Sequence, residues 1–228
     1  MSGTVWPQIL LLSKFEVMAS GDASEQSGNG RATRAKRVPR AVREQQMLDA
    51  AVAVFAERGF HQSSMDTIAT ASGISKPMLY LYYGSKDELF GAILDRESQR
   101  FLEAASQGSS PDFTARETLE RTLAAVLDFV AGHRDAWRVL VREGSSVGEF
   151  ADQIARRRAR LVELTADLLR AGTKEPEQDF DLMAVALVGA GEAVANRVAE
   201  GDLDPARAVE VLTGLAWRGL SGGPRQTD

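Results

Sequence analysis

The stretch SGISKPMLYLYYGSKDEL (residues 72–89) combines a turn glycine, a proline directly after a lysine and three tyrosines within four positions. A short helix beginning near Ser75 would bury little more than Leu79, so its lysine and tyrosine side chains would remain near the surface. Hydroxyl and ammonium groups donate hydrogen bonds to phosphate oxygens. We therefore expect this helix to lie against a polyanion. The competing interpretation is that the tyrosines only fill the junction with the next helix, and we expect this for Tyr83.

The residues around this stretch have the spacing of a helix-turn-helix over about residues 63–82. Ala69 is small enough for two helices to cross closely, and Gly73 can adopt the positive φ of a tight turn. Apolar residues that would hold the pair to the preceding helix stand at Met65, Ile68, Ile74 and Leu79. Serines precede the three helical segments and are expected to cap them: Ser64, Ser75 and Ser85. A generic helical hairpin would reproduce only some of these matches.

The outward side of the expected second helix carries the chemistry of a nucleic-acid contact. Lys76 and Tyr80 are four residues apart and therefore share one side of the helix. Pro77, Met78 and Leu81 add small or apolar surfaces that suit thymine methyl groups. Side chains able to reach phosphate oxygens are Tyr80, Tyr82 and Lys86. These features favour the major groove of duplex DNA.

The rest of the chain from Pro39 onward also has helical periodicity, which predicts an all-α protein of about nine helices. The first helix should stop at Gly59, a usual helix end. Later helices are expected at about 86–106, 114–131, 135–143, 149–171, 178–199 and 205–218. Their breaks divide the chain into a small unit at 40–100 and a larger helical unit at 101–220, with a disordered tail at 221–228.

Charge is distributed unevenly along the chain. The net charge is −5, yet RATRAKRVPRAVR (31–43) holds six basic residues and no acid. We expect residues 1–39 to be a disordered extension whose basic arm contacts DNA, although a solvated basic tail is the alternative. The first 17 residues could also precede a true start at Met18. The apolar run ILLL (9–12) is too short to span a bilayer, so no membrane contact is expected and the protein should be cytoplasmic.

Nothing in the sequence favours an enzyme. The chain has no cysteine and only two histidines, His61 and His133, which fall in separate units. A glycine-rich phosphate loop, a nucleophile elbow and a metal-ligand cluster are all missing from the sequence. We therefore expect no catalytic residues, no cofactor and no metal site. A purely structural helical module would leave the basic, tyrosine-rich helix without a purpose.

Residues 40–100 resemble the DNA-binding region of the TetR/AcrR family of bacterial transcriptional repressors. The resemblance is carried by MLDAAVAVFAERGFHQSSMDTIATASGISKPMLYLYYGSKDELFGAIL (47–94). It implies a homodimer that places one helix of each subunit in the major groove. It also implies that residues 101–220 form an effector-binding and dimerisation domain, with its last two helices at the dimer interface.

The resemblance also implies specific DNA contacts. Phosphate contacts would come from Ser64, Tyr82 and Lys86, and groove contacts from Ser75, Lys76, Pro77, Met78 and Tyr80. Two positions depart from the family pattern. Tyr83 stands where phenylalanine is usual, and Pro77 stands where glycine is common, which puts in doubt the base that this position approaches.

The last two expected helices resemble the dimer-forming pair of the family, although both could instead pack within one subunit. Glu192 and Asn196 are the polar exceptions in DLMAVALVGAGEAVANRVAEG (181–201). They could meet across the dimer, point into a ligand pocket or lie at the exposed edge of the apolar stripe.

The segment HRDAWRVLVREGS (133–145) is the other candidate for the effector site. His133, Trp137 and Val141 are the candidate ligand contacts here, although Trp137 could equally be a core residue and His133 a helix-end residue. The apolar interior suggests a lipophilic effector. We expect a ligand-responsive homodimeric repressor that binds a palindromic operator and is released by that effector. The alternatives are a helical protein-interaction module and an activator without small-molecule release.

Overall fold

The computed structural model describes residues 39–108, 110, 112–144, 147–172 and 179–221. The expected basic arm and disordered tail therefore lie largely outside the described residues. The helices are α2 (Arg40–Gln62), α3 (Met65–Ala71), α4 (Lys76–Tyr82), α5 (Lys86–Gln107), α6 (Ala115–Gly132), α7 (Arg134–Arg138), the π-helical turn η2 (Val139–Glu143), α9 (Gly148–Gly172), α10 (Phe180–Glu200) and α11 (Pro205–Ser221). Strands are absent from the described part of the chain, which confirms the all-α prediction.

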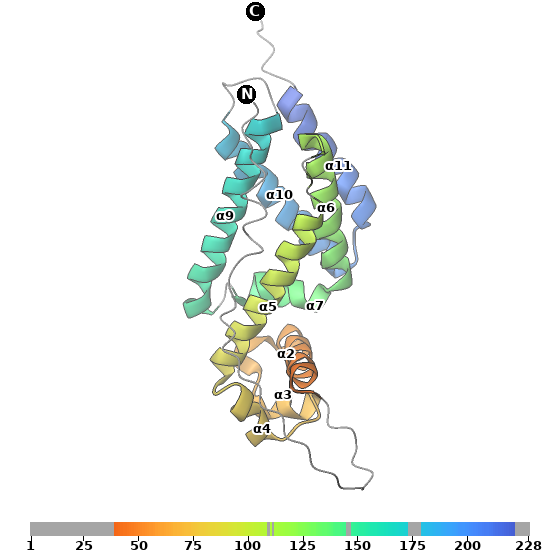
Figure 1. Cartoon of the computed structure of the whole chain (residues 1–228). Helices are drawn as coiled ribbons and strands as arrows, with labels where there is room; N and C mark the ends of the chain where they lie inside the picture. The colour runs from red at the N-terminus through yellow and green to blue at the C-terminus, as the bar shows by residue number, and fades with distance from the viewer. Residues whose placement is uncertain (1–38, 109, 111, 145–146, 173–178, 222–228) are drawn as a thin grey trace, which may run out of the picture.

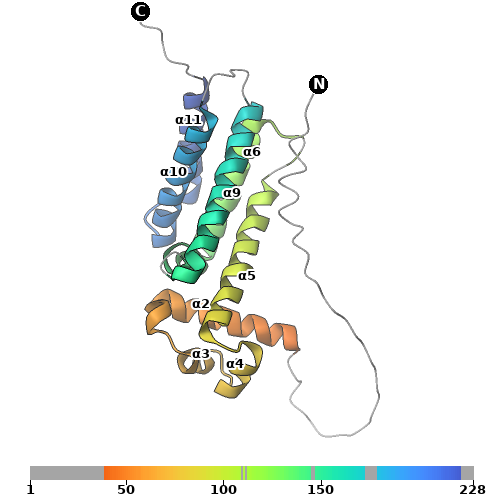
Figure 2. The same cartoon turned by 90° about the vertical axis from the view of Figure 1, so that its left-hand side faces the viewer.

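The helices form two layers that α5 connects. In Figure 1, α2, α3 and α4 lie at one end of the molecule, and α6, α9, α10 and α11 form a bundle above them. Figure 2 shows α5 leaving the α3–α4 end and running up beside α6 and α9. The predicted boundary near residue 100 consequently falls inside α5, which belongs to both layers.

The first helix stops where the sequence predicts. Gly59 has φ 77° and ψ 164°, so regular helix breaks there and only a short turn continues to Gln62. The break turns Phe60 inward against Phe55 and Phe90, with ring centroids 5.8 Å and 4.8 Å away. These aromatic contacts bind α2 to α5 and form the centre of the first core.

The helix-turn-helix has the predicted turn. Gly73 adopts φ 67°, and its neighbours Ile68 and Leu79 are fully buried. Ser64 and Ser85 cap α3 and α5 as expected by accepting hydrogen bonds from the N–H groups of Thr67 and Glu88.

The prediction that Ser75 caps α4 is wrong. Ser75 occupies the N-cap position of α4, but its side chain makes no capping hydrogen bond. An N-cap oxygen accepts from the second or third helical N–H. Pro77 holds the second position and has no N–H, so Ser75 loses one of its two possible donors.

The core of the layer formed by α2, α3 and α4 is completed by residues from α7 and η2. Ala136, Val139 and Leu140 are buried in the same cluster as Phe55 and Phe90. A hydrogen bond also joins the layers: the Phe60 N–H, freed by the break at Gly59, donates to Glu143 Oε2 at 2.8 Å. The segment α7–η2 is thus part of both units.

The ring of Tyr83 lies in the core, as predicted, but the burial of its hydroxyl group costs stability. The residue is 7% exposed, and its buried hydroxyl oxygen has no hydrogen-bond partner. Burial, followed by the nearby charge of Glu44, raises the pKa of Tyr83 from 10.0 to about 12. The folded protein therefore keeps this phenol neutral at a pH where the unfolded chain would ionise it.

We expect Tyr83→Phe to remove the cost of burying this hydroxyl group. Leaving a buried polar group unsatisfied costs about 1–3 kcal/mol, so the variant should be as stable as the parent, or slightly more stable, at pH 7. Between pH 7 and pH 11 the parent should lose about 1.4 kcal/mol more than the variant, because its folded state holds the phenol proton to a higher pH than the unfolded chain does. Urea unfolding at pH 7 and pH 11 measures both effects. A variant destabilised at pH 7 would show that the hydroxyl has a partner.

Helix α10 is long and apolar enough to cross a membrane by length and composition alone. In this protein it packs against α9, α6, α11 and α7. Its apolar residues include Ala184, Val188, Ala195 and Val198, which are buried against these neighbours or in the adjoining cores. The packing makes α10 a helix of the bundle.

Candidate nucleic-acid interface

Helix α4 presents an outward face at the end of the molecule farthest from the bundle (Figure 2). Tyr80 is 42% and Leu81 78% exposed, whereas Leu79, directly before them, is fully buried. Ser75, Lys76 and Pro77 are also exposed, and Met78 is half-buried. The predicted groove residues are therefore brought together on one surface.

Lys76 is held by a partner that the sequence analysis did not assign to it. Its Nζ lies 2.9 Å and 3.0 Å from the two carboxylate oxygens of Asp66 on α3. The ammonium also lies 6.0 Å from the centre of the Tyr80 ring. The hydrogen bond to Asp66 raises the pKa of Lys76 above its usual value. The carboxylate of Asp66 thus offsets the charge of Lys76 on the outward face of α4.

We expect Asp66→Asn to make DNA binding tighter and more dependent on salt. An unmasked Lys76 can neutralise one more phosphate, and each such contact steepens the slope of log K against log salt by about 0.9. Binding isotherms between 50 and 300 mM salt measure the slope. Asp128→Asn on α6, an exposed site with the same charge change, is the control. An equal slope in the Asp66 and Asp128 variants would contradict the prediction.

Ser64 and Ser75 differ in how available their hydroxyl groups are. Ser64 Oγ accepts from the Thr67 N–H at 3.1 Å and lies 2.9 Å from Thr67 Oγ1. It can still donate to a phosphate oxygen because the residue is exposed. The Ser75 hydroxyl makes no capping hydrogen bond to α4, so no such bond fixes its orientation.

Lys86 is engaged within the protein. Its Nζ donates to the carbonyl oxygens of Phe60 and Ser63 at 2.9 Å and 3.1 Å and lies 4.3 Å above the Phe60 ring. The Phe60 carbonyl also accepts from the Ser63 N–H, so Lys86 reinforces the end of α2. One of the three ammonium N–H bonds remains for an external acceptor. The phosphate contact implied for Lys86 stays a prediction.

Tyr82 lies at the other end of the recognition helix. It is half-buried, and the guanidinium of Arg40 stacks 5.3 Å from its ring centre. Arg40 begins α2 and is one of the basic residues of 31–43. The stacking places this cation next to a residue expected to contact phosphate. Sequence spacing gave no signal for this pairing.

Three of the polar candidates for ligand binding, Trp137, Asn196 and Glu192, have partners within the same chain. Trp137 Nε1 donates to Asn196 Oδ1 at 2.9 Å, which joins two candidate ligand residues 59 positions apart. Trp137 is buried in the second core and lies 5.8 Å from the Phe101 ring. Glu192 instead accepts from Arg158 Nε at 2.8 and 3.0 Å, linking α10 to α9. Neither intrachain contact was among the three alternatives considered for Glu192 and Asn196.

His133 is the helix-end residue that the sequence suggested. It ends α6, its Nδ1 lies 3.0 Å from the Phe129 carbonyl oxygen, and its ring stacks on Phe129 at 4.5 Å. Val141 is half-buried and packs against both the first and the second core. The candidates for ligand binding therefore do not gather in one apolar pocket among the described residues.

Comparisons with known proteins cover most of the chain. The family model for "Bacterial regulatory proteins, tetR family" matches residues 47–93, and that for "Tetracyclin repressor-like, C-terminal domain" matches residues 115–219. The HTH-type transcriptional activator FasR of Mycolicibacterium smegmatis is 32% identical over 195 residues, 84% of this chain and 89% of that protein. The HTH-type transcriptional repressor SCO4008 of Streptomyces coelicolor is 33% identical over 102 residues, 45% of this chain and 50% of that protein. A solved TetR-like transcriptional regulator from Rhodococcus sp. RHA1 is 56% identical with a TM-score of 0.77, over 82% of this chain and 100% of that one.

Proposed function

Because this chain belongs to the TetR family of bacterial transcriptional regulators, we propose that it binds a palindromic DNA operator as a homodimer and responds to a small effector. The observation that carries the proposal is the exposed face of α4, where Lys76, Tyr80 and Leu81 protrude from a helix-turn-helix that is anchored by the buried Ile68 and Leu79. Two such helices must be held about one duplex turn apart to read two half-sites. Because bacterial DNA lies in the cytoplasm, a protein that binds an operator would also be located there.

The homodimer is supported by an uncovered apolar face on the last two helices. Leu182 and Val185 on α10 are 64% and 46% exposed, and Val211 and Leu215 on α11 are 49% and 60% exposed. Four large aliphatic side chains on two adjacent helices form an apolar surface, and such surfaces in soluble proteins commonly bind partners. A second copy is the partner we propose, since a two-fold axis would pair this face with itself.

The response to an effector follows from the path of α5 through both layers. A ligand that prefers one orientation of α5 and α7 over another would change the separation of the two α4 helices, and the affinity for the operator would change with it. Release of a repressor is our first proposal for the outcome. Activation is the second, because the relative that aligns over 89% of its length is named an activator. Transcription in vitro from the promoter of the native gene, with and without protein, separates the two.

The DNA-binding proposal is tested with the double variant Lys76→Ala/Tyr80→Phe. Removing two contacts of the recognition helix should weaken operator binding about 30-fold or more, since base and phosphate contacts contribute about 1–3 kcal/mol each. Thermal stability should be nearly unchanged because both side chains are exposed. Gel-shift titrations with the DNA flanking the native gene provide the measurement. Arg156→Ala, an exposed cation on α9, is the charge-matched control.

The outcomes of this test are distinct. Loss of specific binding with retained stability supports the assignment of α4. Equal binding by the variant and the control would remove α4 from the interface. A variant that unfolds would show that these side chains stabilise the fold.

A further inference from the structure

A polar pocket lies where the DNA-binding layer meets the bundle. Its volume is about 480 Å³, within the range of small-molecule sites, and α2, α5 and the α6–α7 turn enclose it. One wall is formed by Asp49, Val52, Arg96, Glu97 and Arg100, and the other by residues 131–136 and Arg138. This position differs from the interior of the bundle, where the candidate effector residues Trp137 and Asn196 bind each other.

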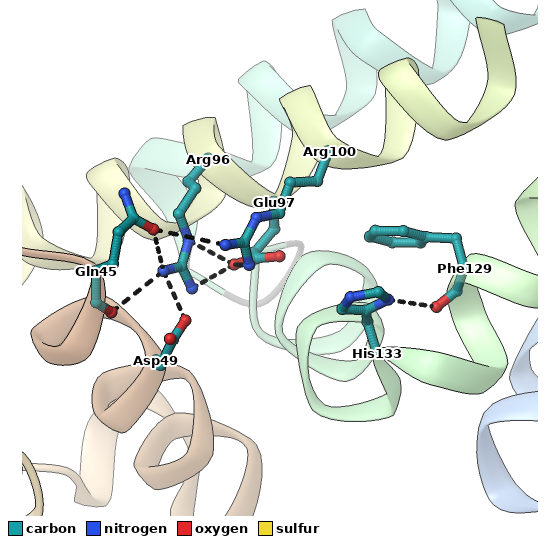
Figure 3. Close-up of polar contacts among 7 residues, drawn as sticks. All are labelled: Gln45, Asp49, Arg96, Glu97, Arg100, Phe129 and His133. Atoms are coloured by element: carbon teal, nitrogen blue, oxygen red, sulfur yellow. Dashed lines mark hydrogen bonds and ion pairs between the residues drawn. The ribbon is translucent and has the colours of Figure 1, made fainter. Parts of the chain in front are cut away.

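Glu97 organises the first wall (Figure 3). Its Oε1 accepts from Arg96 Nε at 2.7 Å and lies 3.3 Å from a terminal nitrogen of Arg100. Arg96 continues to Asp49 at 2.7 Å and to the Gln45 side chain at 3.1 Å, so the network ties α5 to α2. The arginines of this wall are therefore held in place by contacts on α2.

The second oxygen of Glu97 has no partner. The residue is 1% exposed, and Oε2 is buried without a hydrogen bond. A buried charged group that lacks a donor is costly, and natural proteins rarely leave one without a reason. Figure 3 shows the carboxylate between the two arginines and the turn that carries His133. A molecule entering the pocket with an N–H or O–H group would supply the missing donor after a small adjustment of the wall.

The lining as a whole favours an anionic group beside that donor. Four arginines line the pocket, Arg96, Arg100, Arg134 and Arg138, against three acids, Asp49, Glu97 and Asp135, which gives an excess of one positive charge over these seven groups. Arg96, Arg100 and Arg138 already form ion pairs with the acids, so the excess charge is that of Arg134. Guanidinium groups bind carboxylates with paired, charge-assisted hydrogen bonds.

We propose that the junction pocket binds a small polar acid that donates a hydrogen bond from an ammonium or hydroxyl group to Glu97 and places a carboxylate among the arginines. Such a ligand differs from the lipophilic effector that the apolar interior suggested. Its effect on DNA rests on the proposed function: the ligand would bridge α2 and α5 to the α6–α7 turn and so fix the orientation of the recognition helix. Binding itself does not depend on DNA.

Three four-carbon dicarboxylates test the chemistry on the full chain without DNA. L-aspartate carries an ammonium group, L-malate a hydroxyl group and succinate neither, while the carboxylates are the same. We expect calorimetric titration and thermal shift to show that aspartate or malate binds about 10-fold or more tightly than succinate, because one charge-assisted hydrogen bond contributes about 1.5–3 kcal/mol. The better of the two donors identifies the ammonium or the hydroxyl class. Absence of binding, or equal binding of all three, overturns the proposal.

Variants connect that preference to the pocket. Glu97→Gln should reduce the preference over succinate to less than about 3-fold. Arg134→Gln, on the opposite wall, should weaken the binding of all three acids. This variant tests the site if the Glu97 variant fails to fold. Glu163→Gln, an exposed acid on α9, is the control and should bind as the parent does. A preference that survives Glu97→Gln, or affinities unchanged by Arg134→Gln, would refute the site.

Parallel gel shifts separate the two proposals. If the protein shows the expected ligand preference but does not bind the operator, the DNA-binding proposal is refuted and the pocket proposal stands. Operator binding without any ligand preference would do the reverse.

Discussion

Replacing Gly108 with alanine is expected to cost about 3 kcal/mol or more of the free energy of unfolding. Gly108 ends α5 at the point where α6 crosses closest to it. A Cβ added there would lie 2.6 Å from the carbonyl carbon of Arg121 and closer still to the backbone N and Cα of Thr122. All three are helical backbone atoms that cannot turn aside as a side chain can. The α5–α6 packing that joins the two layers would have to open.

Urea unfolding of Gly108→Ala and of Gly132→Ala measures this effect against a matched control. Gly132 also stands at a helix end, and a Cβ there would meet no atom within 4 Å. Alanine at 132 should therefore change the stability by about 0.5 kcal/mol or less. Similar midpoints for the two variants would mean that α5 and α6 are farther apart in solution.

In the proposed homodimer, Leu215→Glu is expected to separate the subunits and to reduce operator affinity about 100-fold or more. The leucine is 60% exposed on the apolar face of α10 and α11, and a two-fold axis would bring two copies of it into one interface. Burying two unpaired carboxylates there costs several kcal/mol. A monomer contacts only one half-site, so it loses the gain in affinity that comes from linking two recognition helices.

Sedimentation velocity and operator titrations measure the two consequences together. Leu203→Glu, in the loop between α10 and α11, introduces the same charge at a position 38% exposed and outside the helix face. This control should remain dimeric. A Leu215 variant that sediments as the parent does would place the dimer interface elsewhere.

Local features of the fold were predictable because they depend on neighbouring residues. The breaks at Gly59 and Gly73, the caps at Ser64 and Ser85 and the burial of Leu79 all follow from spacing within one or two helical turns. Ser75 shows the limit of this approach. Its residue type favours a cap, but the proline two positions later removes one of the two possible donors.

The interactions that were not predicted join residues far apart in the chain. Trp137 meets Asn196, Arg158 meets Glu192, and Lys86 reaches back to Phe60. Each pairing depends on how helices cross, and helical periodicity carries no information about crossing. For the same reason the pairing of Asp66 with Lys76 across the turn of the helix-turn-helix was not predicted.

The sharing of α7 and η2 between the two layers has a consequence for engineering. A fragment cut near residue 100 would lose Ala136, Val139 and Leu140 and the carboxylate of Glu143 that receives the Phe60 N–H. Chimeras that join α2, α3 and α4 to the sensor domain of another protein should therefore include residues 136–143, because these residues complete the core of that layer.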